Sequence, residues 1–206
     1  MFLVGCARAG LAGRRGTYST RSPTRAGLRV RPAAGYDPRV LPYLSGYSPA
    51  LQAQVQALVD AGRLADTLRA RYRGRHEVRS DAALYDYVQA LRQRHLRNAA
   101  PVTKVAYDSK LQVIRQALGT HTTVSRVQGT KLKAKREIRI ASLFRDTPPE
   151  FLRMIVVHEL AHLKERAHDK AFYALCEHME PAYHQIEFDV RLYLTQCDLS
   201  AEPVFG

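Results

Sequence analysis

The sequence has no tryptophan, only three cysteines and no long apolar run. The cysteines, Cys6, Cys176 and Cys197, are odd in number and lack paired metal-binding spacing, so neither a disulfide framework nor a zinc ribbon is indicated. No stretch approaches the roughly 18 to 20 consecutive apolar residues that cross a bilayer. We therefore expect a soluble protein that does not enter membranes and that works in a reducing compartment, most simply the cytoplasm.

Acidic residues are missing from the first 35 residues, which are rich in Arg, Gly, Ser and Thr. Residues 1–40 hold eight arginines against Asp37 alone, a composition that predicts disorder. An organellar transit peptide, or a start codon placed upstream of the true one, would produce the same pattern. We expect an Arg-rich extension over 1–40, one domain over 41–200 and a short tail over 201–206.

The formal charge of the whole chain is +13, but residues 41–206 hold 24 basic and 18 acidic residues, a balance of +6. A moderately basic domain tolerates anionic substrates such as nucleotides. There is no Cys-rich finger, no RNP-like aromatic motif and no helix-turn-helix pattern. No specific nucleic-acid binding is predicted.

The segment Ile155 to Tyr173, IVVHELAHLKERAHDKAFY, carries the clearest chemical signal. His158 and His162 are four apart, so a helix places both imidazoles on one face, where they can bind one ion. Glu159 lies roughly 100° around the helix from His158, where its carboxylate can accept a proton from a water at the ion. The apolar residues before His158 predict a buried helix, in which two imidazoles and a carboxylate need a compensating partner such as a metal. The pattern favours a hydrolase that uses Zn²⁺, although other divalent transition metals can occupy such a site.

A catalytic zinc usually has three protein ligands and one open position. His168 is the preferred third ligand, because the six-residue step from His162 gives the chain room to leave the helix, and Asp169 can then cap the next helix. A carboxylate from a later helix is the alternative, and the candidates are Glu177, Glu180 and Glu187.

The stretch from Lys131 to Leu143 alternates charged and apolar residues in the manner of a half-buried strand. It could hold a peptide substrate by backbone pairing, or its cations could attract phosphates. The candidate substrate-binding residues are Lys131, Lys133, Arg136 and Arg139. For any single one of them, a solvated charge on an exposed strand is the more common role.

Other patterns outline the rest of the domain. Residues 49–71 predict two short helices or one helix interrupted at Gly62, and 81–97 predict a helix; KVAYD and TTVSRV predict short strands. Helices are expected over 172–180 and 183–194. Packing is the more common role of Tyr173, Tyr183 and His184, but each could donate a hydrogen bond to developing negative charge. Glu187 or Asp189 could orient a ligand histidine through its second ring nitrogen.

The run VVHELAHLKERAHDKAFYALCEHMEPAYHQIEFDVRLYL, together with LPYLSGY, LRNAAPVTKVAYDSK and ALGTHTTVSRVQGTKLKAKREIRIASLF, resembles the YgjP-like metallopeptidase-domain family, which is related to the SprT-like zinc proteins. The resemblance spans roughly Leu41 to Leu199. It implies that His158, His162 and His168 bind the metal and that Glu159 is the base.

The resemblance implies an α+β fold, a minimal zincin-like domain with N-terminal helices, a small sheet, the metal helix and C-terminal helices. It implies attack of water on a peptide bond. Proteins of this family have also been assigned as UTP pyrophosphatases, so hydrolysis of UTP to UMP and pyrophosphate at the same metal is the alternative. A non-catalytic, metal-stabilised binding protein is a further alternative.

Overall fold

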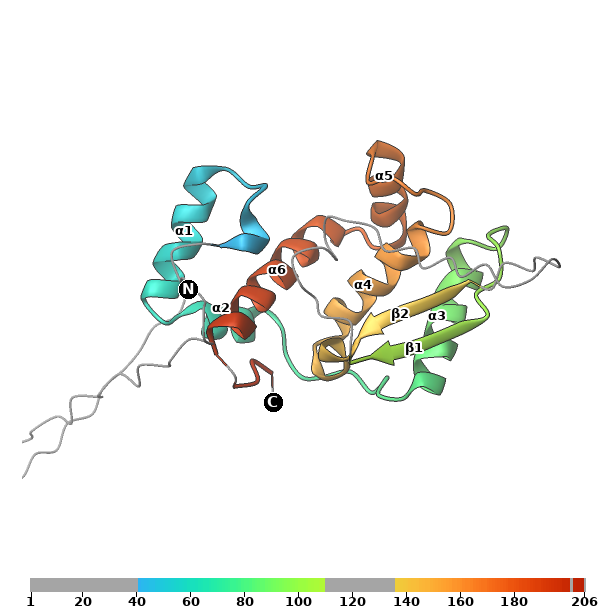
Figure 1. The fold of residues 1–206 in the computed structure, drawn as a ribbon, viewed down its shortest axis with the longest axis horizontal. Helices are drawn as coiled ribbons and strands as arrows, with labels where there is room; N and C mark the ends of the chain where they lie inside the picture. The colour runs from blue at the N-terminus through green and yellow to red at the C-terminus, as the bar shows by residue number, and fades with distance from the viewer. Residues whose placement is uncertain (1–40, 110–135, 201, 206) are drawn as a thin grey trace, which may run out of the picture.

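The computed structural model describes residues 41–109, 136–200 and 202–205. In chain order its elements are a 3₁₀ turn at Pro42–Leu44, helices α1 (Pro49–Asp60), α2 (Leu64–Arg71) and α3 (Asp81–His95), strands β1 (Lys104–Asp108) and β2 (Glu137–Ala141), a 3₁₀ turn at Ser142–Asp146, and helices α4 (Pro149–Ala161), α5 (Lys170–Met179) and α6 (Tyr183–Leu199). The class is α+β, as predicted (Figure 1).

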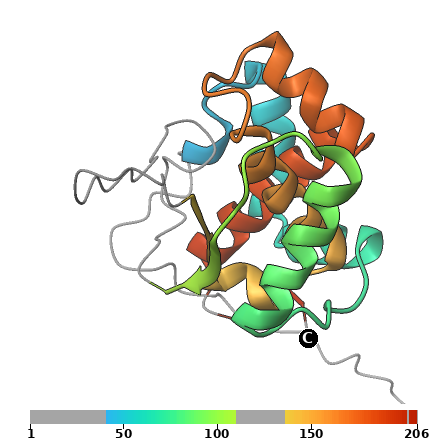
Figure 2. The same cartoon turned by 90° about the vertical axis from the view of Figure 1, so that its right-hand side faces the viewer.

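Helix α4 is the centre of the domain. It contacts α3, α5, α6 and β2, and most of its side chains are buried. Helix α3 covers it from the side that faces the viewer in Figure 2. The helix begins at Pro149, which occupies a first-turn position that needs no backbone donor.

Strands β1 and β2 pair in parallel, with Val105 opposite Ile138 and Tyr107 opposite Ile140. These four side chains are buried toward the helices, while four of the alternate positions carry charges on the other face, namely Lys104, Asp108, Glu137 and Arg139. Strand KVAYD is confirmed, and the strand expected within 131–143 is described over 137–141. The predicted strand TTVSRV and the residues Lys131 and Lys133 lie outside the described residues.

Local signals explain the helix ends. Gly62 has a φ of 65°, a left-handed conformation that separates α1 from α2, so the two-helix alternative is correct. Ser48 and Ser80 accept hydrogen bonds from the first turns of α1 and α3. Asp169 Oδ1 accepts from Phe172 N at 3.0 Å, which confirms the predicted cap of α5.

Helix α6 is attached to the N-terminal helices by a buried carboxylate. Asp189 is 2% exposed, and its oxygens accept from Arg71 at 2.8 and 2.6 Å, from Tyr72 at 2.7 Å and from Gln185 at 3.1 Å. Asp189 therefore stabilises the contact between α2 and α6 and does not orient a ligand histidine.

The described end of the chain also packs into the core. Val204 and Phe205 are buried, and the Phe205 ring lies 5.6 Å from the ring centre of Phe151. Arg69 Nε donates to Val204 O at 2.8 Å. No helix among the described residues is long and apolar enough to span a membrane.

Candidate metal centre

Helix α4 ends one residue before the second histidine of the motif. His162 is the C-cap, and its φ of −64° and ψ of −11° keep it in the helical conformation. Its imidazole therefore remains on the same face as that of His158, as the four-residue spacing predicts. The chain then turns back, and His168 lies immediately before the cap of α5.

The three histidines converge through their Nε2 atoms. The separations are 3.3 Å between His158 and His162, 3.2 Å between His158 and His168, and 3.1 Å between His162 and His168. At a metal–nitrogen distance of about 2.05 Å, these separations correspond to angles of about 98° to 107° at the metal, close to tetrahedral. Three imidazole nitrogens so close together fit a shared cation, and the donor set suits Zn²⁺.

Two of the imidazoles are oriented through their other ring nitrogen. His158 Nδ1 lies 2.7 Å from Tyr183 Oη, and His162 Nδ1 lies 3.0 Å from the backbone oxygen of Glu165. When Nδ1 carries the proton and donates these bonds, Nε2 keeps its lone pair for a metal. Both acceptors are neutral groups.

Phe172 forms an apolar support under the cluster. Its ring centre lies 5.0 Å from the ring of His158 and 4.6 Å from the rings of His162 and His168. The side chain is fully buried. The sequence predicts only a helix over 172–180, and no sequence signal ties Phe172 to the three histidines.

Glu159 directly follows His158 on α4 and is half-buried. Burial raises the pKa of its carboxyl from 4.5 to about 7. A carboxylate with this pKa can accept a proton near neutral pH, as a general base requires.

The alternative carboxylate ligands have other contacts. Glu177 lies 3.4 Å from His184, Glu180 pairs with Arg153 at 2.5 Å, and Glu187 pairs with Arg191 at 2.7 Å. Among the described residues, the only group that could hold a metal is formed by the three histidines. The structure thus brings His168, and none of these glutamates, to the other two histidines.

The predicted substrate-binding cations are separated. Arg136 Nη1 donates to the backbone oxygen of Leu163 at 3.0 Å, so it lies beside the loop between His162 and His168. Arg139 is on the exposed face of the sheet and pairs with Asp108 at 2.9 Å and Glu137 at 3.2 Å. Only Arg136 is close to the loop that carries the ligands.

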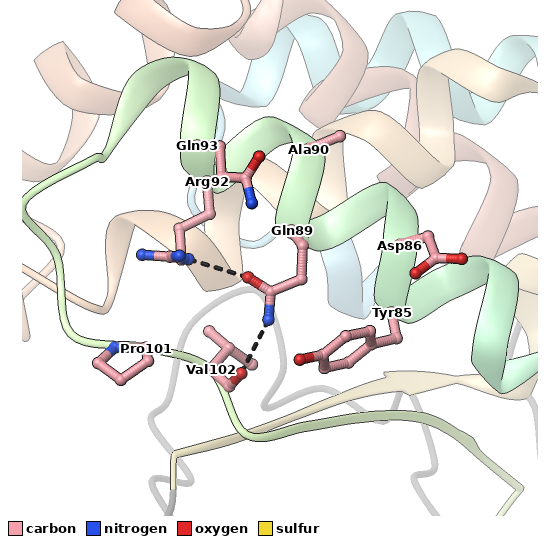
Figure 3. Close-up of a pocket in the computed structure, with 8 residues that line it drawn as sticks. All are labelled: Tyr85, Asp86, Gln89, Ala90, Arg92, Gln93, Pro101 and Val102. Carbon is pink, nitrogen blue, oxygen red and sulfur yellow. Dashed lines mark hydrogen bonds between the residues drawn. The ribbon is translucent and has the colours of Figure 1, made fainter.

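A shallow pocket lies elsewhere, on the outer side of α3 (Figure 3). Two of its polar side chains are bonded to each other and to the following loop. Gln89 donates to Val102 O at 2.8 Å and accepts from Arg92 at 3.0 Å, and Arg92 also donates to Ala99 O at 3.2 Å. None of the three histidines lines the pocket. We infer that its polar side chains attach the loop after α3 to this helix.

Comparison with known proteins agrees with the metal centre. Residues 32–190 match the family model described as YgjP-like, metallopeptidase domain. The chain is 58% identical over 164 residues to a UTP pyrophosphatase of Escherichia coli (strain K12), an alignment that covers 80% of this chain and 98% of that protein. No solved structure matches the chain.

The family match covers well over half of the chain, and both the family and the relative are described as hydrolytic. These descriptions argue against the alternative of a metal-stabilised binding protein that catalyses no reaction. The chain belongs to the YgjP-like metallopeptidase-domain family and is a metal-dependent hydrolase.

Proposed function

We propose that this protein is a zinc-dependent nucleotide pyrophosphatase that hydrolyses UTP to UMP and pyrophosphate at the centre formed by His158, His162 and His168. The observation that carries the proposal is the near full-length similarity to a UTP pyrophosphatase, 58% identical over 98% of that protein, combined with three histidines arranged for one ion.

The charge of the centre supports an anionic substrate. Its three ligands are neutral imidazoles, and the groups that orient His158 and His162 are a phenol and a backbone carbonyl, which are also neutral. A divalent cation would therefore keep nearly its full charge, whereas a carboxylate ligand would offset part of it. A triphosphate is attracted by such a charge more strongly than a peptide carbonyl.

The loop between the ligands adds further positive charge. Lys164 and Arg166 are exposed between His162 and His168, and Lys170 is exposed just after them. Arg136 approaches the same loop from β2. We assign the phosphate chain of the nucleotide to this side of the centre, because cations around the leaving pyrophosphate stabilise its charge.

Each residue has a defined role in the proposed reaction. The histidines hold the ion, which when bound supplies a Lewis acid and lowers the pKa of water. Glu159 accepts the proton from the water that attacks the α-phosphorus. Attack there breaks the bond to the bridging oxygen, and pyrophosphate leaves with that oxygen. The Phe172 ring keeps one side of the imidazole cluster dry.

The proposal is tested by incubating zinc-loaded protein with UTP, CTP, ATP and GTP and analysing the products. We expect UMP and pyrophosphate in equal amounts, with UTP preferred. Formation of UDP and phosphate, or absence of turnover on every nucleotide, would contradict it.

Peptide cleavage is the second candidate. It rests on the HExxH motif formed by residues 158–162 at the end of α4 and on the description of the matching family as a metallopeptidase domain. The same experiment, run in parallel with an unfolded protein such as reduced casein, tests it. New peptide termini, lost in Glu159→Gln and formed without any nucleotide turnover, would favour this candidate over the first.

A further inference from the structure

Tyr183 begins helix α6, and its side chain is fully buried. Its hydroxyl oxygen lies 2.7 Å from Nδ1 of His158, a ligand histidine on the neighbouring helix. This is a short, buried contact between α4 and α6 at the centre itself.

The direction of this hydrogen bond follows from the other nitrogen of the ring. His158 Nε2 faces the Nε2 atoms of His162 and His168 at 3.3 and 3.2 Å, where an N–H would point into the cluster. Nε2 is therefore the ligand atom and Nδ1 carries the proton. Nδ1 donates, and Tyr183 Oη accepts.

The Tyr183 hydroxyl also interacts with the Cys176 thiol of α5, and this interaction by itself lowers the pKa of the thiol. Cys176 is fully buried. Burial outweighs the interaction and raises the pKa of the Cys176 thiol to about 12, so the thiol is neutral. Side chains from three helices thus come together behind the centre.

We propose that Tyr183, supported by Cys176, is a positioning residue of the metal centre, which fixes the tautomer and the ring orientation of His158 for metal binding. The proposal rests on the metal centre in the proposed function, but not on the identity of the substrate. Partners of ligand histidines in other proteins are commonly carboxylates or carbonyls. A buried phenol performs the same orientation without adding a negative charge.

Helix α6 supplies a matched control. Tyr193 is also buried and also interacts with a cysteine, Cys197. It lies ten residues beyond Tyr183, about 15 Å along the helix axis. It packs against Phe151 and Phe205, far from the histidines. Tyr193→Phe therefore removes the same hydroxyl from the same kind of pair, without touching the centre.

The test measures zinc affinity of the full chain by competition with a chromophoric chelator, at a temperature where every variant is folded by circular dichroism. We expect Tyr183→Phe to weaken zinc binding by about 10- to 100-fold, the usual effect of losing such a partner. Tyr193→Phe should stay within about twofold of the wild type. In the Co²⁺-substituted protein, the visible spectrum should change in Tyr183→Phe alone.

Cys176 is tested by two variants. Cys176→Ser keeps a polar partner for the Tyr183 hydroxyl, and Cys176→Ala removes it, so the alanine variant should bind zinc more weakly than the serine variant. Zinc affinity of Tyr183→Phe within twofold of the wild type, or an equal loss in Tyr193→Phe, would overturn the proposal. Because zinc affinity is the readout, this result is independent of whether UTP is a substrate.

Discussion

His162 Nε2 and His168 Nε2 lie 3.1 Å apart, although the chain leaves helix α4 between them. The second histidine of the motif is the helix cap, and the third approaches from the start of α5. A single ion at this point would therefore bind both ends of the intervening turn and hold α4 and α5 together.

Removal of the third ligand should abolish tight metal binding. We expect His168→Ala to weaken zinc affinity by at least about 100-fold, since loss of a ligand costs more than loss of a group that orients one. Zinc should then no longer raise the melting temperature at micromolar concentrations. The control is His178→Ala, which changes an exposed histidine on α5. If His168→Ala binds zinc as tightly as this control, His168 is not a ligand.

Phe172 should affect both stability and the centre. Truncation in Phe172→Ala leaves a cavity under three imidazoles, and we expect a loss of about 3 to 5 kcal/mol in the free energy of unfolding. Zinc affinity should fall as well, because the imidazoles lose their support.

Phe144→Ala provides the comparison for Phe172. Phe144 is 1% exposed and belongs to the turn before α4. Its truncation should cost similar stability in urea unfolding, yet leave zinc affinity unchanged. Equal zinc affinities in the two variants would mean that Phe172 is only a core residue.

The raised pKa of Glu159 predicts a pH-dependent stability of the metal-free protein. The folded pKa of about 7 exceeds the unfolded value of about 4.5, so the folded state prefers the protonated carboxyl. That contribution is complete below pH 4.5 and is lost as pH rises through 7. In Glu159→Gln the side chain is neutral at every pH, so the variant does not lose this stability as the pH rises.

Urea unfolding in the presence of EDTA checks this prediction. Relative to the wild type, Glu159→Gln should gain about 1 to 3 kcal/mol between pH 4.5 and pH 8. If the stability difference between the variant and the wild type is constant over this range, the pKa of the Glu159 carboxyl is not raised in the folded protein.

The buried carboxylate of Asp189 should depend on Arg71. Arg71→Ala leaves Asp189 with only Tyr72 and Gln185 as donors among the bonds described, and we expect a loss of about 1 to 3 kcal/mol, reduced from the value for a fully buried pair because Arg71 is half exposed. Asp66→Ala breaks an exposed pair on the same helix and should change stability by less than about 0.5 kcal/mol. Equal effects in urea unfolding would contradict this role of Asp189.

The two histidines of the motif could be placed together from the sequence because helix periodicity fixes their relation. The four-residue spacing of His158 and His162 is a local constraint, and the structure brings their nitrogens together. The candidates for the third metal-binding residue were His168 and three later glutamates, and spacing alone cannot choose between them. The cap at Asp169 was a local signal as well, and it is present.

Contacts between distant elements could not be predicted in the same way. Nothing in the sequence pairs Tyr183 with His158; packing was the role favoured for this tyrosine, with an oxyanion donor as the alternative. Asp189 is a conspicuous acid near the motif, but its partners Arg71 and Tyr72 lie more than 100 residues earlier. The parallel pairing of β1 with β2 also depends on the tertiary fold, because a strand pattern does not name its partner.

The central claim is that Glu159 and the three histidines form one hydrolytic centre. Its most direct test is pyrophosphate release from UTP by wild-type protein and Glu159→Gln, each loaded with one zinc and matched for zinc content. The account predicts at least about 100-fold slower release in the variant, with zinc affinity within a few fold of the wild type. Equal rates in the two proteins would contradict the claim.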